Sequence, residues 1–454
     1  MKAKTARDEE RAIEAVHEKF IDFVSATSLL DDIDRDYVRL SRSYGRNNAF
    51  LGWKSPPYRE AIKAVKALYP AVSDKSIGRI VADSMVKLLE DQVVSEDADP
   101  QAQARLETIL PVLDRKAIRV QVEAFLSSLS SKVALHTIFL PLQGIRLSPR
   151  ELKIGYATLW DTESSTLSAE VSALKTTDER KRLFLDPFTG TACHVSIDVE
   201  GDFEFARVQA LRAAQSVVDI LNLCLASSRH RRAGYKKICL LGHPSEAPQS
   251  FLGRATPSSD PASRPAYSFH GIDEPSRLYE IRHEDVDRWT KNGLPTVVDA
   301  VQSDDPPPGS IPARIKRSVT WYSKAMNADT LEEQFVGFSI ALEALLVGSE
   351  GMDPKQSWGS ITQRLAEAVA FLIGGDCTDR IRFASHTKDL YGMRSGIVHR
   401  GETVSASNLV SLDDIVSTTT WAFVRHQFPR WEAFVEWLDA QKYAGAISPG
   451  DTAT

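Results

Sequence analysis

One arginine and one histidine near the end of the chain have the types and spacing for RNA cleavage. Arg394 and His399 are separated by four residues in DLYGMRSGIVHRGE, residues 389–402. Histidine titrates near neutral pH, so it can act as a general acid or base toward a hydroxyl group. Arginine stays charged and can stabilise a phosphorane through forked hydrogen bonds. Because RNA carries its own nucleophile, the 2′-hydroxyl, such a site needs no metal ion.

The spacing alone is a weak signal. An arginine followed by a histidine after four to six residues occurs five times in this chain, at Arg11/His17, Arg264/His270, Arg277/His283, Arg380/His386 and Arg394/His399. At least four of these pairs must be bystanders. The pair Arg394/His399 differs in its context, because it ends an amphipathic helical pattern, precedes Gly401 and is flanked by Tyr391 and Arg400.

The elements that must position this pair are helical. From Ile311 onward, five helical periods are predicted, over residues 314–327, 330–348, 360–374, 379–399 and 409–428. Gly348, Gly374 and Gly401 follow three of these periods, where a left-handed C-terminal cap favours glycine. Three consecutive prolines in residues 304–308 mark a boundary before the helical region.

The preceding residues predict two further regions. Residues 1–130 are expected to be helical, with helices over 7–26, 58–69, 75–93 and 100–128 and an irregular segment between the first two. Residues 131–310 are expected to form an α/β region, with strands in 132–147, 153–160, 183–201 and 236–242, a helix over 203–226 and a long surface loop over 244–269. We therefore predict an α+β multidomain protein that ends in an all-α bundle over 311–442 and a disordered tail over 443–454.

Composition limits the classes of function. The chain has 454 residues and a formal net charge of −6, which excludes binding of nucleic acid by bulk charge. Residues 311–442 hold 14 Lys and Arg against 16 Asp and Glu, so an RNA cleft there must be local. We expect no membrane span, no signal peptide and a cytoplasmic location. We also expect reduced cysteines, no metal site and no cofactor, because zinc spacing and a phosphate-binding glycine loop are absent from the sequence.

A basic run outside the helical region could contact RNA phosphates. It is RHRRAGYKK, residues 229–237, with cations at Arg229, Arg231, Arg232, Lys236 and Lys237. A solvated loop leading into the strand at Ile238 is an equal alternative. Trp421, Trp431 and Trp437 are expected to pack within the bundle or against a dimer partner rather than to stack on bases.

The segment LYGMRSGIVHRG resembles the signature of Apea-like HEPN domains. Residues 321–346 are similar to the first long helix of that family, residues 361–374 to its middle helix and residues 422–438 to its terminal helix. The resemblance covers about 311–440, and a weaker one extends to the strand-and-helix region before it.

This resemblance implies a helical bundle that forms a homodimer and cleaves RNA without metal, in prokaryotic defence or toxin action. Carried over by motif, Arg394 would hold the scissile phosphate, His399 would act as acid or base, and Ser395 would position one of them. Many active sites of the family have Asn, Asp or His in place of Ser395. Glu343, polar in an apolar run, would either support the site or pair with a bundle arginine such as Arg364 or Arg394. The two upstream regions would act as a sensor of a protein trigger or as an inhibitor.

The alternative hypothesis is a non-catalytic HEPN module for dimerisation or RNA binding, in a complex that senses a protein.

Overall fold

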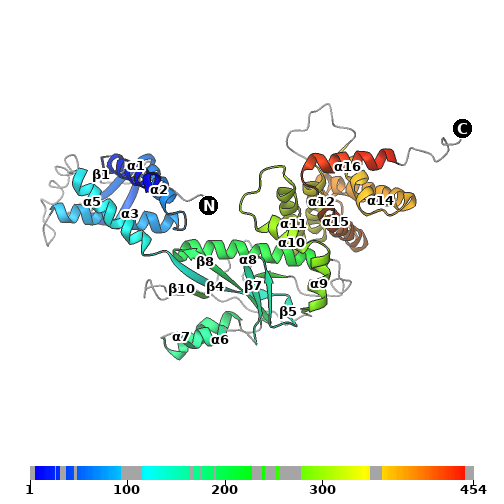
Figure 1. The fold of residues 1–454 in the computed structure, drawn as a ribbon, viewed down its shortest axis with the longest axis horizontal. Coiled ribbons are helices and arrows are strands. Elements are labelled where there is room, and N and C mark those ends of the chain that lie inside the picture. The colour runs from blue at the N-terminus through cyan, green and yellow to red at the C-terminus, as the bar shows by residue number, and fades with distance from the viewer. Residues whose placement is uncertain are drawn as a thin grey trace. The chain divides into compact units, whose positions relative to one another are not determined.

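The structure is a computed structural model that describes residues 6–25, 27–30, 37–44, 49–93, 115–163, 167–173, 176–188, 191–226, 238–240, 252–255, 278–347 and 360–444. It is a mixed α+β protein with N-terminal helices, a central antiparallel sheet with a long helix, and a C-terminal helical region, which confirms the predicted fold class (Figure 1). The chain divides into two compact units. One comprises Met1–Ile138, Asp198–Ala210 and Gly253–Arg264, and the other comprises Phe139–Ile197, Leu211–Leu252 and Pro265–Thr454.

The N-terminal helices pack around a common apolar core. They are α1 (Ala6–Ser25), α2 (Ser55–Leu68), α3 (Asp74–Val93) and α5 (Arg115–Ser130). Phe20, Phe23, Val65, Ile77 and Phe125 are buried in this core. Helical spacing therefore identifies these apolar faces correctly. The predicted helix over 100–128 begins at Arg115 in the described residues, and residues 94–114 lie outside them.

The prediction of an irregular segment after the first helix was wrong. The chain there forms strands β1 (Thr27–Leu30), β2 (Tyr37–Tyr44) and β3 (Ala49–Lys54), paired in the order β1-β3-β2. β1 and β2 each pair with β3 in the antiparallel direction. Tyr, Val, Leu, Phe and Trp favour extended backbone, and polar residues interleaved with them are compatible with a strand that has one polar face.

The central sheet contains six strands. They are β4 (Ala134–Gln143), β6 (Glu151–Ile154), β7 (Ala157–Asp161), β8 (Cys193–Gly201), β9 (Cys239–Leu240) and β10 (Leu252–Ala255). The order is β10-β4-β8-β7-β6, and β9 pairs with β4. β5 (Ile145–Leu147) pairs separately and in parallel with β11 (Tyr279–Ile281). The predicted helix over 203–226 is confirmed as α8 (Phe203–Ala226), whose first turn is capped by the Asp202 carboxylate accepting from Phe205 N at 3.1 Å.

Three predictions for the central region were wrong or incomplete. Leu183–Leu185 is helical, because it ends α7 (Asp178–Leu185), which follows α6 (Leu167–Ala173). The Thr177 side chain accepts from Arg180 N and starts α7, and a 3₁₀ helix, η2 (Asp186–Phe188), follows. The predicted loop over 244–269 contains strand β10, and its other residues lie outside the described ones. Helices α9 (His283–Lys291) and α10 (Leu294–Gln302) were not predicted.

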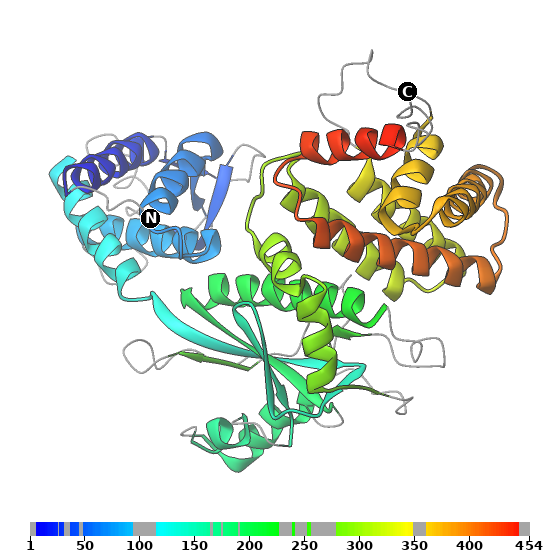
Figure 2. The ribbon, with the colours of Figure 1, turned by 45° about the vertical axis from the view of Figure 1, so that its right-hand side comes forward.

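The C-terminal region contains six helices rather than five in its described residues. They are α11 (Ile311–Asn327), α12 (Leu331–Leu346), α13 (Ile361–Ile373), α14 (Cys377–Arg400), α15 (Ala406–His426) and α16 (Trp431–Ala444). Figure 2 shows them, coloured yellow to red, packed against one another. Their buried apolar side chains include Phe335, Leu345, Leu365, Val416 and Phe423.

The last two helices correct the predicted terminal helix over 422–438. Gln427 has a left-handed φ of 51° and Pro429 follows, so α15 ends before α16 begins. Rings at the junction pack together: the Phe423, Phe428 and Trp437 rings lie within 4.6–6.2 Å of neighbouring rings. The expected packing role of Trp437 is therefore observed.

Two glycines test the predicted caps. Gly401 ends α14 with a φ of 66°, as predicted. Gly374 follows α13 with a φ of −82°, so the left-handed cap predicted there was wrong. A Cβ at Gly374 would lie 2.5 Å from the Ala370 carbonyl oxygen, so close approach rather than backbone angle favours glycine there. Gly348 lies outside the described residues.

The last helix extends slightly beyond its predicted end, and the cysteines form no disulfides in the described residues. Tyr443 and Ala444, placed in the predicted tail, belong to α16, and the later tail residues lie outside the described ones. All four cysteines are free; Cys193 and Cys224 are buried, whereas Cys377 is exposed. Within the described ranges, no helix combines the length and the apolar character that a membrane crossing requires.

Candidate functional site

The candidate site lies at the C-terminal end of α14. This helix begins where the Asp376 carboxylate accepts from Asp379 N at 2.8 Å. It ends where Gly401 N donates to Ile397 O at 3.1 Å and Glu402 N donates to Gly396 O at 3.3 Å. The helix therefore persists through His399. Ser395 and His399, four residues apart, lie on one face of it, and both are exposed.

Arg394 faces a carboxylate from a second helix. Its Nε lies 3.3 Å from Glu343 Oε1 of α12, and the two side chains are 32% and 23% exposed. The Nε–H is not directed at that oxygen, so the contact is an ion pair rather than a hydrogen bond. The Arg394 guanidinium also lies 5.7 Å from the centre of the Tyr391 ring. The ion pair expected between Glu343 and a bundle arginine thus forms with Arg394.

Tyr391 holds the Glu343 carboxylate in place. Its hydroxyl donates to Glu343 Oε1 at 2.6 Å. Burial raises the pKa of Tyr391, and the hydrogen bond to the Glu343 carboxylate raises it further. Tyr391 therefore stays protonated and serves as a donor. Glu343 Oε1 accepts the Tyr391 hydrogen bond and also forms the ion pair with Arg394. These three residues therefore form one polar cluster between α12 and α14.

Arg400 has a carboxylate partner of its own, which sequence analysis missed. Its Nε donates to Glu402 Oε1 at 2.5 Å. This hydrogen bond raises the pKa of Arg400 and lowers that of Glu402. The Glu402 side chain crosses Gly396, where a Cβ would lie 2.0 Å from Glu402 Oε2. The sequence signal for this pair is Glu402, an acidic residue two positions after Arg400 at the end of the helix.

Arg394 and His399 face different surroundings within one chain. Five residues rotate a side chain by about 140° around a helix axis. Arg394 therefore lies against α12, whereas His399 faces solvent. No hydrogen bond or ion pair joins them in the described part of the chain. A phosphate bound at Arg394 would thus need its acid or base from a moved His399 or from a second copy of the chain.

The basic run predicted as a possible RNA contact lies outside the described residues. Its cations are Arg229, Arg231, Arg232, Lys236 and Lys237.

Arg314 of α11 has a structural role. It is buried, donates to Gly309 O at 3.0 Å and to Val347 O at 3.1 Å, and stacks on Trp431 at 3.6 Å. The Arg314 guanidinium therefore makes its contacts inside the helical bundle.

Within the ranges that the structure describes, no three His, Cys, Asp or Glu side chains converge as metal ligands would. Comparisons with protein-family models, curated proteins and solved structures give no match to this chain. The resemblance to Apea-like HEPN domains therefore depends on its motif residues alone.

Proposed function

We propose that this protein is a metal-independent endoribonuclease of the HEPN type. Arg394 binds the scissile phosphate, His399 transfers protons, and Ser395 positions one of them. The observation that carries the proposal is the C-terminal end of α14, where His399 and Ser395 are exposed on one face and Arg394, on another face, pairs with the Glu343 carboxylate that Tyr391 holds. A histidine for proton transfer and an arginine for phosphate are the groups that 2′-hydroxyl attack requires.

The reaction needs two proton transfers. A base removes the 2′-hydroxyl proton as O2′ attacks phosphorus, and an acid protonates O5′ as the P–O5′ bond breaks. The products are a 2′,3′-cyclic phosphate and a 5′-hydroxyl. One imidazole cannot be base and acid in the same step, so two copies of His399 suit the chemistry. A homodimer through the C-terminal bundle would supply both.

Most of the surface of helix α14 is not buried, so it is available for contact with a second copy of the chain. Of its 24 residues, only Thr387, Leu390 and Gly396 are buried. Gly392 and Ser395 are small exposed residues on the same face of α14 as His399, and a Cβ at Gly392 would meet no atom within 4 Å. This uncovered face supports the proposed homodimer.

Both arginines of the motif already face carboxylates, and this observation favours the alternative function. In a non-catalytic dimerisation or RNA-binding module, the Glu343 and Glu402 pairs would be permanent. In the nuclease, RNA phosphate replaces Glu343 as the partner of Arg394. The prokaryotic defence or toxin setting and the role of the upstream regions as a sensor or inhibitor remain part of this proposal by resemblance. The cytoplasmic location remains part of it on the sequence expectation alone.

The test is RNA cleavage in the presence of EDTA. We expect the purified full chain to cut tRNA or a generic RNA, leaving cyclic phosphate ends. His399→Ala should abolish the cut while the dimer survives in light scattering. If the Arg394→Ala/His399→Ala variant keeps the full biological effect of the wild type, the alternative function is correct.

A further inference from the structure

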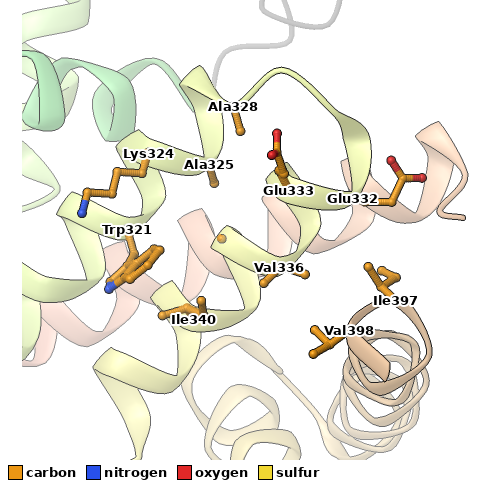
Figure 3. Close-up of a pocket in the computed structure, with 11 residues that line it drawn as sticks. Trp321, Lys324, Ala325, Ala328, Glu332, Glu333, Val336, Ile340, Ile397 and Val398 are labelled. Carbon is orange, nitrogen blue, oxygen red and sulfur yellow. The ribbon is translucent and has the colours of Figure 1, made fainter. Parts of the chain in front are cut away.

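An apolar pocket lies beside the catalytic end of α14. It has a volume of about 390 Å³ and is formed by three helices. Its walls include Trp321 and Ala325 of α11, Val336 and Ile340 of α12, and Ile397 and Val398 of α14. Figure 3 shows Ile397 and Val398 across the pocket from Val336. The volume falls in the range of small-molecule sites, about 300–1,000 Å³.

Close packing of α11 and α12 shapes this pocket. A Cβ at Gly337 would lie 2.8 Å from Ala325 Cβ, so the helices touch at these small residues. Larger side chains on either side remain partly uncovered: Trp321 is 36% exposed and Val398 is 54% exposed. The indole of Trp321 therefore offers an accessible ring beside an apolar wall.

Charged groups lie at both ends of the pocket. Lys324 Nζ lies 4.8 Å from the centre of the Trp321 ring. Glu332 and Glu333 line the other end. Glu332 Oε1 accepts from Val404 N at 3.2 Å, and Glu333 Oε2 accepts from Thr330 N at 3.3 Å. These bonds engage one oxygen of each carboxylate with the backbone and place both glutamates at the rim of the apolar walls.

We propose that this pocket binds a purine base of single-stranded RNA, next to the nucleotide at the cleavage site. A flat base would stack on Trp321 between apolar walls, as unpaired bases do on aromatic side chains. Ring N–H groups would donate to Glu332 or Glu333, and Lys324 would lie near the sugar-phosphate backbone. Guanine fits best, because its N1–H and N2–H₂ are adjacent donors, either of which can donate to a carboxylate oxygen, whereas N1 of adenine only accepts.

Continuity with the candidate site favours RNA over an apolar segment of another protein. Ile397 and Val398 directly precede His399, so a base in the pocket places its own strand at that histidine. A nucleotide also matches charge of both signs, with phosphate for Lys324 and N–H donors for the glutamates. An apolar helix would meet neither charge.

This inference deepens the proposed nuclease function, and its test separates the two. The His399→Ala chain, in EDTA, is titrated calorimetrically with GMP, AMP, CMP, UMP and inorganic phosphate. We expect GMP to bind at least tenfold more tightly than CMP or UMP, AMP to lie between them, and phosphate alone not to displace GMP.

Matched variants locate the binding. In the same His399→Ala background, Trp321→Leu should weaken GMP binding by about 5- to 150-fold, the range for loss of base stacking. Trp321→Phe should keep most of the affinity, and the exposed Ile361→Ala on α13 should keep all of it. Glu332→Gln and Glu333→Gln, which retain an acceptor, should reduce the preference for GMP over CMP.

Each result decides between the proposals. RNA cleavage without detectable mononucleotide binding overturns the base pocket and leaves the nuclease proposal standing. GMP binding that depends on Trp321, in a protein that does not cut RNA, supports the pocket and rejects the nuclease. If Trp321→Leu leaves GMP binding intact but converts dimers to monomers, the pocket is an interface between copies and the base proposal is wrong.

Discussion

The two halves of α14 each carry an arginine followed by a histidine, in different surroundings. In the first half, Arg380 Nε donates to Gly374 O at 3.4 Å, and its guanidinium lies 4.9 Å from the centre of the Phe371 ring. In the second half, Arg394 faces the carboxylate of Glu343. His386 is half-buried, whereas His399 is exposed.

This difference shows how the same spacing can serve two purposes. Arg380 donates to the carbonyl of Gly374, which caps the C-terminal end of α13, where a cation stabilises a helix. Arg394 faces the anionic oxygen of Glu343, which RNA phosphate replaces in the proposed nuclease. The proposal therefore requires that the Arg394–Glu343 ion pair open, and the Arg380 contact makes no such demand.

The largest expected effect separates the two histidines. His399→Ala should lower the initial rate of RNA cleavage about 10²–10⁴-fold, the usual contribution of general acid–base catalysis. His386→Ala, on the same helix, should change it less than twofold. The assay is cleavage of a fluorescent oligoribonucleotide in EDTA. Equal losses in both variants would show that α14 is needed for folding rather than for proton transfer.

A third histidine, His194 of β8, has a shifted pKa although it does not belong to the candidate site. His194 of β8 is fully buried, with its ring 5.9 Å from the Phe139 ring and 5.8 Å from the Phe188 ring. Burial lowers the pKa of His194 to about 4, although the Asp161 carboxylate acts in the opposite direction. An unfolded histidine has a pKa near 6.5.

Acid should therefore destabilise this part of the protein. The stabilising contribution of neutral His194 is complete above pH 6.5 and is lost as the pH falls toward 4, because the unfolded state binds the proton first. We expect a loss of about 2–3 kcal/mol in the free energy of unfolding between pH 7 and pH 4.5. His194→Leu should remove this part of the pH dependence in urea unfolding. The same pH slope in both proteins would contradict the assignment.

The sequence predicts the helical frame of the candidate site because its signals are local. Gly401 and the apolar pattern before it fix the end of α14, and a lone carboxylate in an apolar run indicates an ion pair for Glu343. The Trp321 pocket could not be predicted, since its walls come from α11, α12 and α14. Packing at Gly337 joins α11 and α12, and the end of α14 completes the pocket only in the folded chain.

Two errors in the predicted fold have local causes. Leu183–Leu185 resembles a buried strand, but the Thr177 cap and the acidic first turn favour helix. The terminal helix predicted over 422–438 spans Pro429, a helix breaker whose position the aromatic pattern obscured. In both cases a single capping or breaking residue outweighed the hydrophobic pattern.

A smaller effect is expected from the polar cluster that holds Arg394. Tyr391→Phe removes a hydrogen bond to a charged acceptor, and partial exposure reduces its contribution, so the free energy of unfolding should fall by about 1–2 kcal/mol. Tyr156→Phe, at an exposed tyrosine, should change it by less than about 0.5 kcal/mol. Urea unfolding at pH 7 measures both. Equal changes would mean that Tyr391 does not hold Glu343.

The smallest effect concerns the arginine of the first half. Arg380→Gln loses a long hydrogen bond to Gly374 O and a contact with Phe371, so stability should fall by only about 0.5–1 kcal/mol. The cleavage rate should not change, because Arg380 faces a backbone carbonyl that phosphate does not replace. Arg394→Gln should abolish cleavage, because its partner is the exchangeable carboxylate of Glu343. A loss of cleavage in Arg380→Gln as large as in Arg394→Gln would remove the distinction between the two halves of α14.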